Sequence, residues 1–427
     1  MSALNLLRRK IDIILLAIIL TSGIFLRLPW QAFSDGAPLH ALAWLHPSPA
    51  YDAMGMDEGL YRDYLNAIND DGLGSYPELV QAYILAQKER AGSILPPVRF
   101  LYIFAAYVCH SIFGTESLQA LRQTAAFFSI LTLTVATLFA WRQRGSTWGL
   151  AMAALMVFAP TQLHMSQHAL VDGFFTFWAL LVLWLLWENL NAPRDWRWLV
   201  PYVITFALLV MTKENAFFVW FAVFVLIVVN RWLHFGTVTR ELFFATILGP
   251  LLGVVTLVFL AGGFDILLQT YQLSVSKNLA LEYAILTGDG PWYRYLVDLL
   301  LVSPIVLILA FATIFRLNRA MKPELFMSIF IAASYVVMCN VKYGMNLRYA
   351  NMWDMPLRFL AISSLVSLFT PLGRRRNIVI GVAITLLCFV EMRQYIILFV
   401  QFPLYELVSE GLLRALKILK VAQDLTP

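Results

Sequence analysis

The sequence predicts an all-α fold: a polytopic transmembrane helical bundle of about 11 spans, with a long external first loop that carries short interfacial helices. Three observations lead to this prediction. The 427 residues are 60% hydrophobic and only 13% charged, whereas soluble domains carry roughly 25% charged residues. The mean hydropathy is +0.73. Many stretches reach the ~20 apolar residues that a helix needs to cross a bilayer.

Basic residues in the short loops fix the predicted topology. Cytoplasmic loops of membrane proteins are enriched in Lys and Arg. Six basic clusters are present: Arg8 to Lys10, Arg142 with Arg144, Arg194 with Arg197, Arg231 with Arg240, Arg316 with Arg319 and Lys322, and Arg374 to Arg376. With all six in the cytoplasm the N-terminus is also cytoplasmic. The net charge of +5 therefore reflects membrane orientation, and no nucleic-acid partner is expected.

The apolar stretches agree with this topology, because an even number of spans separates consecutive basic clusters from Arg142 onward. The expected spans are 11–30, 119–141, 146–164, 173–190, 198–212, 214–230, 241–260, 296–315, 325–340, 356–372 and 377–398. The first span is too long for a signal-peptide core, so we expect it to remain as an anchor. The three cysteines, Cys109, Cys339 and Cys388, are in apolar settings and predict neither a disulfide framework nor a zinc site.

One apolar stretch, 97–114, would reverse the side of every later basic cluster if it crossed the membrane. It begins at Pro96-Pro97, ends at Gly114, and contains Arg99 and His110, which are poorly suited to hydrocarbon. We therefore predict a helix in the outer leaflet that does not cross; a true span is the alternative. Residues 402–423 alternate apolar and charged side chains at helical spacing, which predicts an interfacial C-terminal helix within 400–427.

The first loop, 31–118, is the most polar part of the chain. Between Gln31 and Pro96 it contains nine acidic residues and three basic residues. Asp57 and Glu58 lie side by side within it. The other unusual polar groups, around Asp172, Lys213 and Arg348, fall on the same predicted side of the membrane. Polar groups gathered at one face of a membrane protein indicate a binding or active site there.

The order of these motifs resembles a known family. An Asp-Glu pair follows the first span, Leu95-Pro96-Pro97 opens a helix, and the segment from His168 to Asp172 lies between two spans. Met211 to Glu214 then forms a short turn, and Arg348-Tyr349 comes late in the chain. This order is similar to the GT-C superfamily of membrane glycosyltransferases, closest to its protein O-mannosyltransferase and aminoarabinose-transferase-like branch. The resemblance covers the chain to about residue 372.

The resemblance implies catalytic roles for three carboxylates. Asp57 would be the general base that takes the proton of the acceptor hydroxyl, and Glu58 would orient Asp57 or contact the acceptor. Asp172 would be a second carboxylate that binds a metal ion, the acceptor or the sugar. Both features have a plainer interpretation as well: acidic residues favour the first turn of a helix, and Asp172 could serve as the N-cap of the span 173–190.

The donor would leave as a polyprenyl phosphate, whose growing negative charge calls for fixed cations. Arg348 suits this role because a guanidinium binds phosphate oxygens in a bidentate manner, and Lys213 is a second candidate. Glu214, Tyr349 and His168 complete the predicted donor phosphate and sugar site. A divalent metal ion is an open question, with Asp57, Asp172 and His168 as its candidate ligands. Arg348 and Lys213 could instead be snorkelling interfacial cations.

Together these residues predict an inverting glycosyltransferase built as a single transmembrane domain over residues 1–427. It would move a sugar from a polyprenyl-phosphate donor to a hydroxyl or amine of a glycan, lipid or protein acceptor. The reaction would take place at the external, periplasmic face of a bacterial cytoplasmic membrane. Two alternatives are a transporter or flippase of lipid-linked sugars and a non-catalytic partner in envelope polysaccharide assembly. Transport would require polar residues on both faces or in mid-membrane, and few are apparent in the sequence.

Overall fold

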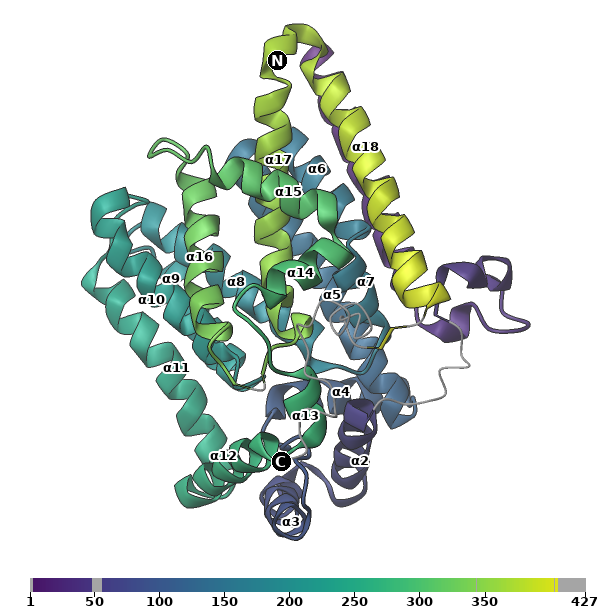
Figure 1. The fold of residues 1–427 in the computed structure, drawn as a ribbon, viewed down its shortest axis with the longest axis vertical. Helices are drawn as coiled ribbons and strands as arrows, with labels where there is room; N and C mark the ends of the chain where they lie inside the picture. Colours follow the sequence, from purple (N-terminus) through teal and green to yellow (C-terminus); the bar gives the residue numbers. More distant parts are fainter. Residues whose placement is uncertain (1–2, 48–55, 343, 403, 406–427) are drawn as a thin grey trace.

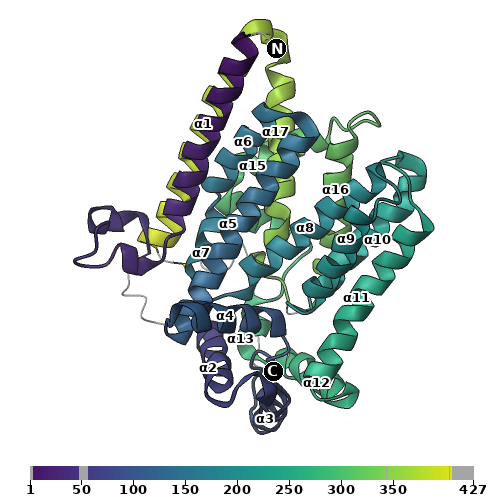
Figure 2. The ribbon, with the colours of Figure 1, turned by 180° about the vertical axis from the view of Figure 1, so that it is seen from behind.

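The computed structural model describes residues 3–47, 56–342, 344–402 and 404–405. Within these residues the chain is helical and contains no strand. The long helices run side by side in a bundle, and the shorter helices α2, α3, α4 and α12 gather at one end of the bundle (Figure 1, and from behind in Figure 2). The predicted C-terminal helix within 400–427 lies largely outside the described residues.

Five helices are long and apolar enough to cross a membrane by length and composition: α5 (Ser117–Arg144), α8 (Val171–Asn191), α10 (Ala216–Leu233), α11 (Arg240–Leu260) and α18 (Arg376–Tyr395), which continues to Gln401. The other predicted spans are shorter, broken or more charged helices: α1 (Ala3–Leu26), α6 (Ser146–Val157) with α7 (Pro160–Gln167), α9 (Trp196–Val210), α14 (Arg294–Val302) with α15 (Pro304–Ile314), α16 (Lys322–Met338) and α17 (Asp354–Leu368). Each predicted span therefore corresponds to a helix or to a helix pair, and the breaks fall at Pro160 and Pro304, where a proline begins the second helix.

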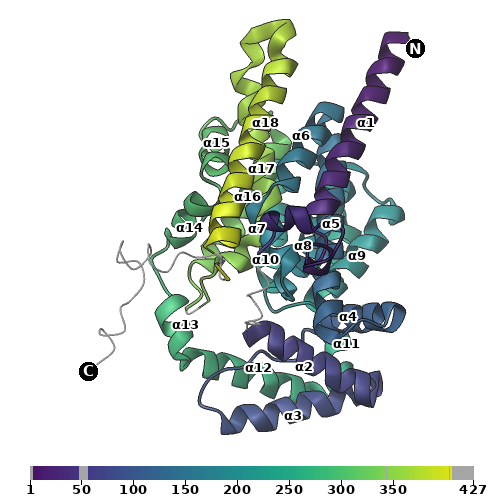
Figure 3. The same ribbon diagram turned by 90° about the vertical axis from the view of Figure 1, so that its right-hand side faces the viewer.

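Residues 56–113 of the first loop and the helices that follow residue 262 form a separate layer of short helices below the bundle (Figure 3). This layer contains α2 (Met56–Asp71), α3 (Tyr76–Glu89), α4 (Phe100–Phe113), α12 (Phe264–Leu279) and α13 (Glu282–Thr287). The helices α12 and α13 lie where the sequence indicated only a loop. The helix α4 has only 14 residues and lies across the end of the bundle. Arg99 precedes it, and Gly114 ends it in a left-handed conformation. A helix is therefore present at 97–114 as expected, and its position in the outer leaflet stays a prediction.

The helices α9 and α11 cross at two glycines. A Cβ atom on Gly249 would lie 2.7 Å from the Phe206 side chain, and one on Gly253 would lie 2.6 Å from the Ala207 carbonyl oxygen. Glycines four residues apart let two helix backbones approach closely within a membrane. The close crossing brings the α9–α10 turn next to α11, where the turn forms part of the site described below.

The bundle interior contains buried charges that sequence analysis did not find. Arg358 on α17 donates hydrogen bonds to Asp354, at 3.0 Å, and to Glu391 on α18, at 2.8 Å. Arg358 and Glu391 are fully buried, and they lie in two of the predicted spans. The expectation that the spans are nearly free of ionisable groups is therefore wrong here. Each buried charge has a partner of opposite sign, which offsets much of its desolvation.

Candidate active site

Four chain segments, in three groups, bring the predicted site residues together at the end of the bundle that faces α2 and α4. The first is the N-terminal turn of α2, which carries Asp57 and Glu58. The second is the α7–α8 connection with the first turn of α8, which carries His168 and Asp172. The third combines the α9–α10 turn, which carries Lys213, with the 3-10 helix η5 (Leu347–Trp353), which carries Arg348. The helix η5 packs against α8 and α7.

Asp57 and Arg348 form the first of two cation–carboxylate pairs in the site. The Arg348 Nη1 atom donates a hydrogen bond of 3.1 Å to Asp57 Oδ2. The Arg348 side chain is 7% exposed and that of Asp57 is 25% exposed. Asp57 therefore lies at the opening of the site and Arg348 lies behind it. The predicted helix start at Asp57 is correct as well, since α2 begins at Met56.

Asp172 and Lys213 form the second pair. Lys213 Nζ donates a hydrogen bond of 2.5 Å to Asp172 Oδ1, and both side chains are buried. Asp172 is not the N-cap of its helix, because α8 begins at Val171 and no side chain caps it. Its carboxylate instead neutralises Lys213. Burial lowers the pKa of Lys213, and the carboxylate of Asp172 opposes this shift.

Tyr349 links the two pairs. The Lys213 ammonium lies 3.8 Å from the centre of the Tyr349 ring, and the Arg348 guanidinium carbon lies 6.0 Å from it. Both distances fall in the range of cation–π attraction. The predicted donor-site residues Arg348, Lys213 and Tyr349 are thus in mutual contact with the two carboxylates.

Glu58 points into the protein rather than toward the opening. Its Oε1 atom accepts hydrogen bonds from the Ala169 amide, at 2.6 Å, and from Arg122 Nε, at 3.2 Å. His168 Nδ1 lies 3.6 Å from its other oxygen. Burial raises the pKa of Glu58, but His168, Arg122 and the Ala169 amide outweigh burial and lower it to about 2. Glu58 is therefore an ionised anchor that holds α2 against the α7–α8 connection.

Glu214 also has a different partner from the one that sequence analysis suggested. Arg99, just before α4, donates a hydrogen bond of 2.6 Å to Glu214 Oε1 and one of 2.7 Å to the Tyr61 hydroxyl. The Leu101 amide donates to the Met211 carbonyl oxygen at 3.0 Å. These contacts fasten the N-terminal end of α4 to the turn that carries Lys213.

Sequence analysis missed Arg99 and Arg122 as residues of the site. Arg99 was considered only as evidence that 97–114 does not cross the membrane, and Arg122 lies inside the expected span 119–141. Neither residue belongs to a recognisable motif. Their contacts with Glu214 and Glu58 join segments that are 115 and 64 residues apart, so no local sequence signal places them at the site.

The candidate metal ligands do not form a metal site. Within the part of the chain that the structure describes, no group of three or more His, Cys, Asp or Glu side chains is arranged to hold a metal ion. Asp57 and Asp172 each face a cationic side chain, and His168 faces Glu58. The charges that a divalent cation would compensate are already paired with protein cations.

An apolar groove begins at the second pair. It has a volume of about 310 Å³ and lies between α9, α10, α11 and α12. Its lining is mostly apolar, but it includes Lys213, Glu214 and Tyr271 at the site: the residues are Val210, Lys213, Glu214, Ala216, Phe217, Trp220, Pro250, Val254 and Tyr271. We call this space the Lys213 groove. It joins a lipid-compatible surface to a buried cation.

The fold is an all-α bundle with several apolar helices of membrane-spanning length, as the sequence predicted. Residues 99–272 match the family described as dolichyl-phosphate-mannose-protein mannosyltransferase. This matched part begins just before α4 and ends in α12, so it includes Asp172, Lys213 and the Lys213 groove.

Two groups of solved structures have the same fold. ArnT from Cupriavidus metallidurans bound to undecaprenyl phosphate is 17% identical, with a TM-score of 0.54 over 91% of this chain and 64% of that chain. The apo oligosaccharyltransferase of Archaeoglobus fulgidus is 13% identical, with a TM-score of 0.57 over 90% of this chain and 56% of that chain. The chain therefore spans less than two thirds of the length of either structure. No match was found among the curated proteins.

Proposed function

We propose that the chain is an inverting membrane glycosyltransferase that uses a polyprenyl-phosphate-linked sugar as donor. One observation carries the proposal. Lys213 lines an apolar groove and also contacts Asp172. Arg348 contacts Asp57, and both cations lie beside the ring of Tyr349. A lipid phosphate needs an apolar channel that ends at cations, and acceptor activation needs a nearby carboxylate. The matched family and the bound lipid of the ArnT structure support the same reaction class.

The reaction has a simple balance of atoms. The acceptor oxygen forms a bond with the anomeric carbon of the sugar while the bond from that carbon to the phosphate oxygen breaks. The polyprenyl phosphate leaves with the electron pair, and Arg348 and Lys213 stabilise its charge. The proton of the acceptor hydroxyl or amine moves to the Asp57 carboxylate. Asp172 is the alternative base, although its contact with Lys213 makes it the weaker candidate.

The ion pair of Asp57 with Arg348 gives the donor a second role. A phosphate competes with the Asp57 carboxylate for the Arg348 guanidinium through strong charge-assisted hydrogen bonds. Donor binding therefore draws Arg348 away from Asp57 and leaves this carboxylate free to accept the proton of the acceptor.

A groove-filling substitution tests the donor assignment. Val254 lies on α11, lines the Lys213 groove and is 41% exposed. In vesicles that contain the full-length protein, Val254→Trp should weaken binding of a radiolabelled polyprenyl-phosphate sugar by about tenfold, because overfilling a packed apolar space costs roughly 1–3 kcal/mol. Val382→Trp on α18, also exposed but outside the groove, is the matched control. Equal donor binding in both variants would remove the donor from this groove.

The external location of the site is also part of the proposal. A reporter inserted near Gly72, in the turn after α2, should be accessible from outside the cell, and a reporter after Arg144 should be cytoplasmic. This sidedness is supported by the even number of expected spans between consecutive basic clusters. An external signal after Arg144 would contradict this sidedness.

A further inference from the structure

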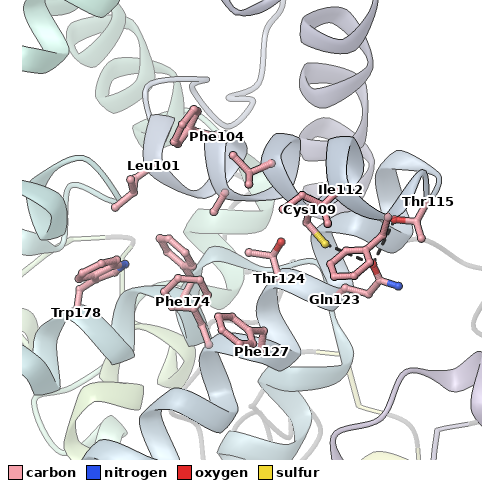
Figure 4. A pocket seen from close by; sticks show the side chains of 14 residues that line it. Leu101, Phe104, Cys109, Ile112, Thr115, Gln123, Thr124, Phe127, Phe174 and Trp178 are labelled. Carbon is pink, nitrogen blue, oxygen red and sulfur yellow. Dashed lines mark hydrogen bonds between the residues drawn. The ribbon is translucent and has the colours of Figure 1, made fainter.

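A second and larger apolar groove is lined by α4. It has a volume of about 880 Å³ and runs between α4, α5 and α8 (Figure 4). Its apolar lining includes Phe104, Phe127, Phe174 and Trp178. No charged side chain lines it. We call this space the α4 groove.

The two ends of the α4 groove differ in polarity. Leu101 and Trp178 lie toward one end, whereas Cys109, Thr115 and Gln123 form a small polar cluster at the other (Figure 4). Gln123 Oε1 accepts hydrogen bonds from the Thr115 hydroxyl, at 3.2 Å, and from the Cys109 thiol, at 3.4 Å. A long apolar channel with uncharged hydrogen-bonding groups at one end suits a neutral amphiphile.

The α4 groove is connected to the candidate active site through the helices that line it. Phe174 follows Asp172 by two residues in the first turn of α8. Gln123 follows Arg122, whose guanidinium contacts Glu58. Leu101 is hydrogen-bonded to Met211, two residues before Lys213. A molecule in the groove therefore contacts α8, which carries Asp172, together with α4 and α5, which are hydrogen-bonded to the Lys213 turn and to α2.

The mouth of the α4 groove is hydrophobic and faces outward. Ile112 and Phe113 on α4 are 67% and 69% exposed, and Phe127 on α5 is 56% exposed. Exposed apolar side chains around a groove in a membrane protein are in contact with lipid rather than with water. The groove is therefore open to molecules that diffuse within the bilayer.

We propose that the α4 groove binds the hydrocarbon chain of the acceptor, so that the acceptor is an uncharged hydroxyl lipid of the membrane. This inference rests on the proposed glycosyltransferase function and specifies its acceptor class. The contrast in charge separates the two substrates. The Lys213 groove ends at a cation and fits the anionic donor, while the α4 groove contains no charged side chain and fits a neutral chain. The two grooves have no lining residue in common, so each can hold its own lipid.

The test compares two acceptors and two variants in vesicles that contain the full-length protein and labelled donor. The lipid acceptor is a series of alkyl glucosides with short, medium and long chains, and the soluble acceptor is a hydrophilic serine peptide. Val108 lines the groove on α4 and is 38% exposed, so Val108→Trp fills the groove with little cost to folding. Val382→Trp on α18 is the matched control.

We expect the wild type to use the long-chain glucoside best and the peptide least. Val108→Trp should raise KM for the long-chain glucoside by about tenfold, with donor binding unchanged, and the control should behave as the wild type. Chain-dependent partition into the bilayer is the same for all three proteins, so the difference between variants isolates the groove.

Two results would overturn the inference. One is transfer to the peptide with the glucosides unused. The other is an equal effect, or no effect, of Val108→Trp and Val382→Trp on the long-chain glucoside, which would mean that the groove only contacts surrounding lipid. Both leave the glycosyltransferase function intact, since donor is still consumed. A wild-type protein that binds no donor would instead contradict the proposed function itself.

Discussion

The molecule contains two clusters of paired charges that differ in how they meet their surroundings. At the candidate active site, Asp57 with Arg348 and Asp172 with Lys213 lie beside a groove, and Asp57 is partly exposed. Between α17 and α18, Arg358 joins Asp354 and Glu391 in a sealed interior. The first cluster borders a groove, whereas the second is enclosed by the helices around it. The same pairing of charges is therefore found beside an open space in one place and in a packed interior in the other.

The largest effect should come from Asp57→Asn, which keeps the size of the side chain but removes the proton acceptor. General-base catalysis contributes about 10²–10⁴-fold, so sugar transfer should fall by that factor while donor binding is retained. Asp63→Asn on the same helix is the control, because Asp63 is exposed and contacts only the neighbouring Arg62. Wild-type transfer by Asp57→Asn would assign the base to another carboxylate, with Asp172 the next candidate.

The sealed cluster should respond in stability rather than in catalysis. Arg358→Met leaves Asp354 and Glu391 buried without their cation, which costs about 3–5 kcal/mol of unfolding free energy. The measurement is thermal unfolding of the purified protein in mild detergent. A double variant, Arg358→Met with Glu391→Leu, should recover part of the loss because it also removes one unpaired carboxylate. A stable single variant would show that the interior tolerates free charges, and the contrast between the clusters would disappear.

Glu58 belongs to the active-site region but should behave like the sealed cluster. Its pKa is lowered to about 2 from an ordinary 4.5, so its contribution to stability is complete above pH 4.5 and is lost as the pH falls through about 2. The shift corresponds to about 3 kcal/mol. Unfolding measured across this pH window should show the loss in the wild type. Glu58→Gln should lack this pH dependence, and an unchanged slope in that variant would assign the acid sensitivity to other carboxylates.

The smallest effect should come from Arg348, whose pairing with Asp57 is exchangeable. Arg348→Ala should weaken donor binding by about 10- to 100-fold, as expected for the loss of a hydrogen bond of roughly 1.5–3 kcal/mol to a charged group. Arg348→Lys should recover only part of the affinity because an ammonium cannot bind phosphate oxygens in the bidentate manner. Titration with a polyprenyl phosphate measures both. Undiminished affinity in Arg348→Ala would leave Lys213 as the cation of the donor site.

The sequence predicted the fold well because hydropathy is a local property. The helices of the bundle, the separate helix α4 and the helix start at Asp57 all follow from short stretches of residues. It did not predict α12, in which polar side chains such as Gln269 and Gln272 interrupt the apolar pattern. Nor did it predict the Arg358 cluster, because the length of an apolar stretch does not reveal a charge that has a partner on another helix.

The motif order also indicated residues that the structure brings close together, but it did not give their partners. Glu58 was expected to orient Asp57, yet it anchors α2 through the Ala169 amide and Arg122. Glu214 was expected at the donor, yet it contacts Arg99. A carboxylate in a motif indicates that a site is near. The direction in which its side chain points depends on which distant cation the fold brings closest.

The attachment of α4 has a consequence for the membranes in which the protein can work. An amphipathic helix that floats in a leaflet takes its depth from the bilayer. Here Arg99 and Leu101 fix the start of α4 to the turn that carries Lys213, so its depth is set by the protein. A thicker or thinner bilayer must then be matched at the lipid-facing helices, where Phe259 on α11 and Phe389 on α18 are 78% and 72% exposed. The reach from lipid to carboxylates thus stays constant when membrane thickness changes.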